Sequence, residues 1–188
     1  SNYGMARGEL LVRVPIPPGN VHRMEAERPN LGRAAHNYEE TLRRYLRVDS
    51  HGLPRLHLVL LGMGTDGHTA SLFPGARNLR NTLRWVSTPF HPQLRSRRMT
   101  LTLPVLNAAH QVLFLVTGPG KAEVLRKVLE QKSDPPLPAQ LVAAAPHPHR
   151  IFLVDESAAA LLTPARPSAA PPGAKPQRSG EEKPRGNQ

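Results

Sequence analysis

Apolar and polar positions divide residues 1–162 into stretches of two kinds. Unbroken apolar runs at 56–61 and 112–117 predict strands buried on both faces, because such strands need no polar side. Each of these runs leads directly into a glycine-rich turn. Shorter apolar runs predict four further strands, at 21–24, 85–88, 99–103 and 151–154.

Apolar residues at helical spacing predict the helices that lie between these strands. Residues 33–47 carry the longest amphipathic pattern, with Glu39 and Glu40 expected on the solvent side. Residues 121–131 carry a second such pattern. Shorter helical segments are predicted at 2–11, at 138–142 and after Asp155, which is expected to cap the last of them.

Buried strands that alternate with helices are typical of an α/β domain. We therefore expect residues 1–162 to form a mainly parallel sheet flanked by helices. Residues 163–188 are rich in Pro, Ala, Gly and charged side chains, and this composition predicts a disordered tail. Ligands of parallel sheets bind at the carboxyl ends of the strands, so the turns that begin at Gly62 and Gly118 are candidate site loops.

The charge balance favours an anionic partner. The 188 residues include 25 Lys and Arg against 14 Asp and Glu, a formal net charge of +11. A phosphorylated metabolite, nucleic acid or an acidic membrane would satisfy that charge, and solvated surface arginines would explain it without any partner. Aromatic residues for base stacking make up only 4% of the chain, and the apolar runs fall well short of the roughly 20 residues that span a bilayer. We therefore expect neither nucleic acid nor membrane as a partner.

Cysteine and histidine usage bears on location and on metals. The chain has no cysteine, which excludes disulfides and fits a cytoplasmic setting. His147 and His149 stand between prolines with no carboxylate nearby, and we interpret them as part of a solvated loop. The sequence thus predicts no metal and no cofactor.

The turn after the first buried run holds the candidate chemistry. Gly62, Gly64 and Gly67 allow a tight backbone path and close approach of a ligand, and they display Asp66 and His68 just beyond the strand. A histidine titrates near neutral pH and suits proton transfer, while the acid can orient it. The same glycines have the spacing of a dinucleotide loop, but the expected long helix and acid-tipped second strand do not follow. A plain strand–turn element, with the histidine making a local hydrogen bond, is the remaining alternative.

Several motifs in order give a more specific indication. The run Gly-Met-Gly-Thr-Asp-Gly-His-Thr-Ala-Ser-Leu-Phe-Pro-Gly at 62–75 resembles the signature of the 6-phosphogluconolactonase family. Arg-Met-Thr-Leu-Thr-Leu-Pro at 98–104 and Gly-Pro-Gly-Lys-Ala at 118–122 are similar to two further motifs of that family. The resemblance covers about residues 1–162 and extends to the superfamily that includes the glucosamine-6-phosphate isomerase/deaminases.

The resemblance implies a fold, a reaction and a set of site residues. It implies a NagB-type layered α/β domain that hydrolyses 6-phospho-D-glucono-1,5-lactone as a monomer, with His68 as general base and Asp66 orienting the loop or the substrate. Arg98 and Lys121 match phosphate-binding positions, with Arg97 the alternative to Arg98 if the register differs by one. The loop amides, including those of Gly64 and Gly67, would contribute to substrate binding. The family's Ser-Gly-Gly-Ser phosphate loop and Asp-Glu-Arg strand end are not found in the sequence, and we interpret the chain as N-terminally truncated, lacking the first strands of the sheet.

Two other functions stay open. The deaminases of the superfamily carry a glutamate five residues after the motif histidine, and this chain has Phe73 there, which favours the lactonase. An inactive remnant or a basic binding fragment would also be compatible with the charge and with the missing motifs.

Overall fold

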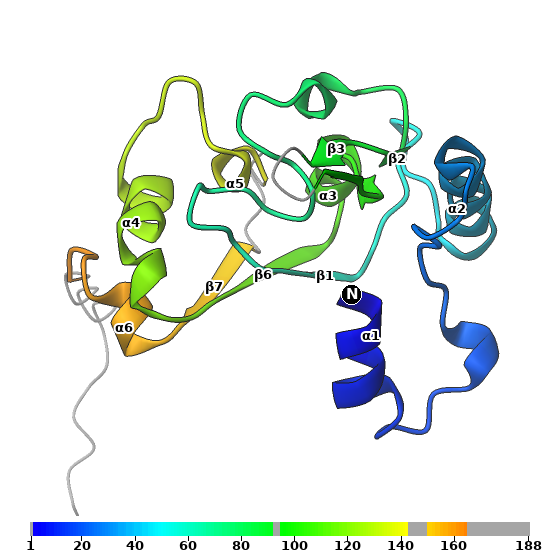
Figure 1. The fold of residues 1–188 in the computed structure, drawn as a ribbon, viewed down its shortest axis with the longest axis horizontal. Coiled ribbons are helices and arrows are strands. Elements are labelled where there is room, and N and C mark those ends of the chain that lie inside the picture. Colours follow the sequence, from blue (N-terminus) through cyan, green and yellow to red (C-terminus); the bar gives the residue numbers. More distant parts are fainter. Residues whose placement is uncertain (1, 92–94, 143–149, 165–188) are drawn as a thin grey trace, which may run out of the picture.

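A three-stranded parallel sheet forms the centre of the chain. The structure, a computed structural model, describes residues 2–91, 95–142 and 150–164. The strands lie in the order β1 (Leu58–Leu61), β6 (Gln111–Val116) and β7 (Arg150–Val154), and all of them run the same way (Figure 1). The predicted α/β fold with a mainly parallel sheet is confirmed.

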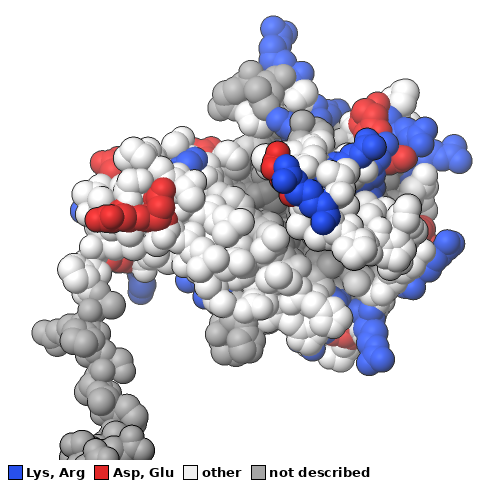
Figure 2. Space-filling model, turned by 90° about the horizontal axis from the view of Figure 1, so that it is seen from below, with Lys and Arg blue, Asp and Glu red and all other residues white. Residues whose placement is uncertain are grey.

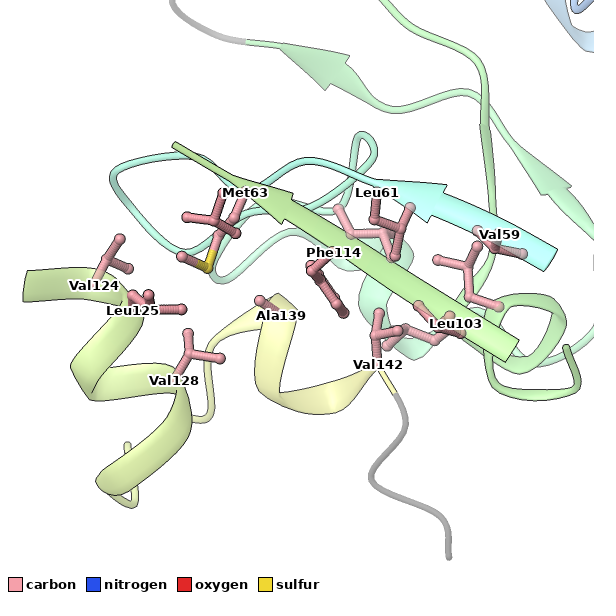
Figure 3. Packing of buried hydrophobic residues seen from close by; sticks show 14 of the residues in the cluster. Val59, Leu61, Met63, Leu103, Phe114, Val124, Leu125, Val128, Ala139 and Val142 are labelled. Carbon is pink, nitrogen blue, oxygen red and sulfur yellow. The ribbon is translucent and has the colours of Figure 1, made fainter. Parts of the chain in front are cut away.

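One face of this sheet carries the core. Figure 3 shows Val59, Leu61 and Phe114 pointing to the same side of the strands, toward α4 (Ala122–Glu130) and α5 (Pro138–Leu141). The helix α3 (Leu103–Asn107) contributes to the same cluster of buried residues. Phe114 is fully buried, and its ring stacks on that of Phe152 with 4.5 Å between centroids. Burial of these apolar side chains is the main contribution that fixes the sheet against its helices.

The opposite face of the sheet is open, so the prediction of burial on both faces is wrong for the runs at 56–61 and 112–117. Leu58 and Leu60 are 48% and 55% exposed, while Val59 and Leu61 are buried. Leu115, Ile151 and Leu153 are exposed on the neighbouring strands, in register with them. Figure 2 shows a broad area without charged side chains on the lower side of the molecule. No described residue covers this apolar face, although its sequence has the character of a covered one.

A second, smaller core lies around the long helix α2 (Leu31–Tyr45). Asn30 caps this helix by accepting a hydrogen bond from the backbone N–H of Arg33, and the buried face packs near Trp85 and Val86. These two residues adjoin a short antiparallel pair of strands, β2 (Val86–Ser87) and β5 (Thr100–Leu101). The helix predicted at 33–47 is confirmed, but it begins and ends two residues earlier.

Glu39 corrects the predicted polar face of α2. It was expected in solvent with Glu40, but its side chain is only 5% exposed. Its Oε1 accepts hydrogen bonds from the backbone N–H groups of Trp85 (2.9 Å) and Val86 (3.0 Å) and from Nε of Arg84 (3.0 Å). A carboxylate can be buried where several donors replace its water, and here these donors attach α2 to β2.

We expect Glu39→Gln to lower the free energy of unfolding by about 1–2 kcal/mol, because an amide oxygen keeps the geometry but loses the charge-assisted part of the bonds. The half-exposed Arg84 contributes less to this loss than the two buried amides. Urea denaturation measures the effect. Glu40→Gln is the matched control, since Glu40 is 58% exposed and its ion pair is with Arg43 on its own helix. Equal loss in both variants would contradict an anchoring role for Glu39.

Other predicted elements differ in type or extent. Residues 21–24 form no strand; this stretch lies beside α2, where the hydroxyl of Tyr38 donates to the backbone oxygen of His22. The strand expected at 99–103 is only β5, because Leu103 already begins α3. A hairpin that the pattern did not predict joins β3 (Phe90–His91) to β4 (Ser96–Arg97).

The two ends of the described chain follow the prediction more closely. α1 (Asn2–Ala6) continues into a π-helical segment, Arg7–Leu11, and α6 (Glu156–Ala159) begins at Asp155, whose side chain accepts from the backbone N–H of Ala158. None of the helices in the described ranges is long and apolar enough to cross a bilayer. Most of the predicted tail, residues 165–188, lies outside the described residues.

Candidate active site

The loop that follows β1 is closed by its own hydrogen bonds. The backbone N–H of Gly64 donates to the oxygen of His68 (2.8 Å), and that of Gly67 donates to the oxygen of Gly64 (3.1 Å). The hydroxyl of Thr69 donates to the oxygen of Gly62 at 2.7 Å, and Thr69 is fully buried. Thr69 stands inside the motif, but the sequence analysis gave it no role. These contacts hold residues 62–69 in one compact turn at the end of the strand.

Asp66 and His68 form a directly bonded pair on this turn. Nδ1 of His68 lies 2.6 Å from Oδ1 of Asp66, and the backbone N–H of His68 donates to the same oxygen at 3.1 Å. The His68 side chain is 32% exposed, so its ring is anchored on one edge and open to solvent on another. The pair that the sequence predicted as neighbours therefore exists as a hydrogen-bonded unit.

The carboxylate fixes which ring nitrogen holds the proton. Partial burial acts to raise the pKa of Asp66, but the hydrogen bonds from the backbone and ring nitrogens of His68 outweigh it, and the pKa lies below its ordinary value. Asp66 is therefore ionised at neutral pH and can only accept, so Nδ1 of His68 must donate. In the neutral ring this leaves Nε2 with its lone pair free to accept a proton.

Two glycines make this geometry possible. A Cβ atom on Gly64 would collide with the ring of His68, so only glycine allows the imidazole to lie against this backbone. Gly67 has a φ of +79°, and a Cβ there would meet the side chain of Leu137 at 2.9 Å. The amides of Gly64 and Gly67 both donate within the described chain. Their predicted part in substrate binding stays a prediction.

The two predicted phosphate ligands lie on separate elements. Arg98 follows β4, and its backbone N–H donates to the oxygen of Pro89 at 2.8 Å. Two residues later, the hydroxyl of Thr100 accepts from the backbone N–H of Ser71, which joins this segment to the motif at 62–75. Lys121 ends the 3-10 turn after β6 and occupies the N-cap position of α4, where the helix dipole favours an anion.

The sheet brings the two glycine turns to one edge. β1 and β6 are parallel, with Leu61 opposite Phe114, so both strands end on the same side. The second turn is held by the carboxylate of Asp155, which accepts from the backbone N–H of Gly118. Bonds from the amides of Ala158 and Gly118 lower the pKa of Asp155, so this anchor is present above the ordinary carboxyl pKa and is lost as the pH falls through the lowered one.

The structure does not place the cations in contact with the histidine. Among the described residues, no hydrogen bond or ion pair joins Arg98, Arg97 or Lys121 to His68, and none of these three side chains has an acidic partner there. Arg97 is exposed, whereas Arg98 is half-buried. His147 and His149 lie outside the described residues.

A parallel α/β domain that presents a hydrogen-bonded histidine–aspartate pair on a glycine turn has the parts of an acid–base site at the sheet edge where ligands of this class of fold bind. Comparison with known proteins identifies the family. The family of glucosamine-6-phosphate isomerases/6-phosphogluconolactonases matches residues 1–152, and the chain belongs to it. Human 6-phosphogluconolactonase is 44% identical over 165 residues, which cover 87% of this chain and 62% of the human protein.

Solved structures agree in fold. The devB protein superposes with a TM-score of 0.77 at 30% identity, covering 87% of this chain and 67% of its own. The 6-phosphogluconolactonase from Trypanosoma brucei gives a TM-score of 0.71 at 29% identity, covering 87% of this chain and 68% of its own. The chain thus spans about six-tenths of the length of the human relative that it matches.

Proposed function

We propose that this protein hydrolyses 6-phospho-D-glucono-1,5-lactone to 6-phospho-D-gluconate, the lactonase step of the oxidative pentose phosphate pathway. The observation that carries the proposal is the bond between Nδ1 of His68 and Oδ1 of Asp66, because it keeps the proton on Nδ1 and leaves Nε2 as the acceptor in the neutral ring. The name of the human relative supports the choice of substrate.

The pair supplies the proton transfers of ester hydrolysis. Nε2 of His68 takes a proton from water as the water oxygen attacks C1 of the lactone. The tetrahedral intermediate then collapses, the bond between C1 and the ring oxygen breaks, and the imidazolium returns the proton to that oxygen. General base assistance of this kind contributes about 10²–10⁴-fold. Asp66 stabilises the imidazolium and keeps Nδ1 protonated throughout.

The cations and the loop would bind the substrate at its other end. Arg98 offers a planar fork of donors to the phosphate, and Lys121 adds a point charge at the start of α4. The absence of acidic partners for either side chain in the described part of the chain supports this role. Loop amides that are not used within the turn would stabilise the oxyanion.

Arg98→Ala is expected to raise KM for the lactone about 10- to 100-fold with kcat changed little, since a phosphate contact contributes uniformly to substrate and transition-state binding. Arg97→Ala is the matched variant from the adjacent position. Unchanged KM in Arg98→Ala together with raised KM in Arg97→Ala would assign the contact to Arg97 instead.

A deaminase is the alternative that the family itself suggests. The position that holds its glutamate is occupied by Phe73, whose ring lies 4.9 Å from that of His68. An apolar ring cannot exchange the protons that isomerisation requires. Lactone hydrolysis above its spontaneous rate, compared with ammonia release from glucosamine 6-phosphate, separates the two activities. Ammonia release without lactone hydrolysis would refute the lactonase proposal.

We further propose a monomer that acts in the cytoplasm without metal, cofactor or nucleic acid. The cysteine-free composition fits a reducing compartment. Light scattering after size exclusion tests the monomer directly, because the apolar sheet face is the surface through which two copies would pair.

A further inference from the structure

The rings of His68 and Phe73, from the motif at 62–75, and the ring of His91, from β3, contact one another in series. The ring of Phe73 lies 4.9 Å from that of His68, with a 50° angle between their planes. The ring of His91 meets Phe73 edge-on, with 4.4 Å between centroids. Phe73 therefore contacts two imidazoles. Asp66 bonds Nδ1 of His68, the backbone of Gly64 lies against the imidazole, and Phe73 adds an aromatic contact to the same ring.

Through Phe73, the ring of His68 is linked to His91 of the β3–β4 hairpin. His91 belongs to β3 and pairs with Ser96 of β4. Arg98 follows directly on the same hairpin, where its backbone N–H is bonded to Pro89. The element that carries the predicted phosphate ligand thus reaches the imidazole through two aromatic contacts. Aromatic pairs at these separations attract each other beyond simple burial and prefer defined orientations.

Phe73 has room to leave this position. It is half-buried and lines a cavity of about 560 Å³ together with Thr88, Pro89 and Phe90. The space beside the ring is not filled by core side chains, so its present orientation depends on the two imidazoles that contact it. Removing His91 would free Phe73 to turn into the cavity, and His68 would then lose its neighbour.

We propose that Phe73 is a positioning residue for the His68 imidazole and that His91 positions Phe73 in turn. This inference rests on the proposed lactonase function and deepens it. Asp66 fixes the nitrogen edge of the ring and Phe73 fixes its tilt, so that Nε2 points to one place. Displacement of a reacting group by about 1 Å can cost 10²-fold in rate, so the tilt matters even though Phe73 touches no substrate atom.

The test compares substitutions that keep or remove a ring. Phe73→Leu is expected to lower kcat about 10- to 100-fold with KM within about twofold, and Phe73→Tyr to retain most of the rate. His91→Ala is expected to lower kcat by a smaller factor, and His91→Phe to restore it, because a ring without nitrogens can make the same edge contact. Phe90→Leu is the matched control, since Phe90 lines the same cavity but its ring stacks on neither imidazole among the described contacts.

A proton NMR signal gives a readout independent of turnover. The Cε1 proton of His68 should show a ring-current shift that disappears in Phe73→Leu and persists in Phe73→Tyr and Phe90→Leu. Unchanged kcat in Phe73→Leu would overturn the proposal. So would a raised KM shared by His91→Ala and His91→Phe, which would make His91 a substrate ligand.

Failure of the proposed function can be told apart from failure of this inference. If the unsubstituted protein does not hydrolyse the lactone, the lactonase function is refuted, and the NMR signal alone decides about the rings. A ring-current shift that responds to Phe73→Leu as described then supports the positioning contact. No shift in the unsubstituted protein overturns it.

Discussion

Replacing His68 with alanine is expected to lower kcat for lactone hydrolysis by about 10²–10⁴-fold, the usual contribution of a positioned general base. The ring is the group whose Nε2 is free while Nδ1 is bonded to Asp66, and no described side chain of the loop offers a second base in that geometry. KM should change less than kcat, because the imidazole acts mainly in the transition state. Rates are corrected for spontaneous hydrolysis of the lactone.

His51→Ala is the control for this variant. His51 is exposed in a turn between α2 and β1, outside the motif at 62–75, and it bonds to Asp49 and Ser50 of its own turn, so its loss should leave kcat unchanged. Since the chain spans only part of its relatives, both variants are measured in the chain alone and in a chain complemented with the part of the human relative that it does not match. Full activity of His68→Ala in either form would remove the histidine from the mechanism.

The local part of the site was predictable because it lies within a few residues of sequence. Asp66 and His68 are two positions apart on a turn shortened by three glycines, so the spacing alone restricts them to hydrogen-bonding distance. The cap at Asp155 and the helix α2 follow equally local rules of capping and periodicity. Arg98 and Lys121 depend on how separate elements approach the loop, and their roles remain predictions.

Three of the misjudged features depend on partners distant in sequence. Glu39 looks like an ordinary solvent-side residue of an amphipathic helix, and its burial follows from two backbone amides 46 and 47 residues away. The apolar run at 56–61 has the composition of a strand covered on both sides, but composition does not say what covers it. His91 reaches Phe73 only because an unpredicted hairpin forms between 90 and 97.

Gly64→Ala is expected to lower kcat as much as loss of the contact between His68 and Asp66 would. A methyl group at this position would occupy the space of the His68 ring, and the ring must move for the chain to accommodate it. The bond between Nδ1 and Asp66 would be broken or bent by that movement. We expect kcat to fall by about 10²-fold, as for a misplacement of about 1 Å. The melting temperature should fall only modestly, since the imidazole can swing toward solvent.

Gly62→Ala is the matched control for this substitution. Gly62 lies two positions earlier on the same turn, with no atom within 4 Å of an added Cβ and no positive φ, so alanine should be accepted there with little change in kcat. The two variants make the same chemical change and differ only in whether a ring lies in front of the new methyl group. An equal loss in both would mean that the whole turn requires flexibility. A loss confined to Gly64→Ala would mean that the glycine is required because the imidazole rests on it. The comparison decides whether Gly64 is required for the conformation of the turn or for the space that the His68 imidazole occupies.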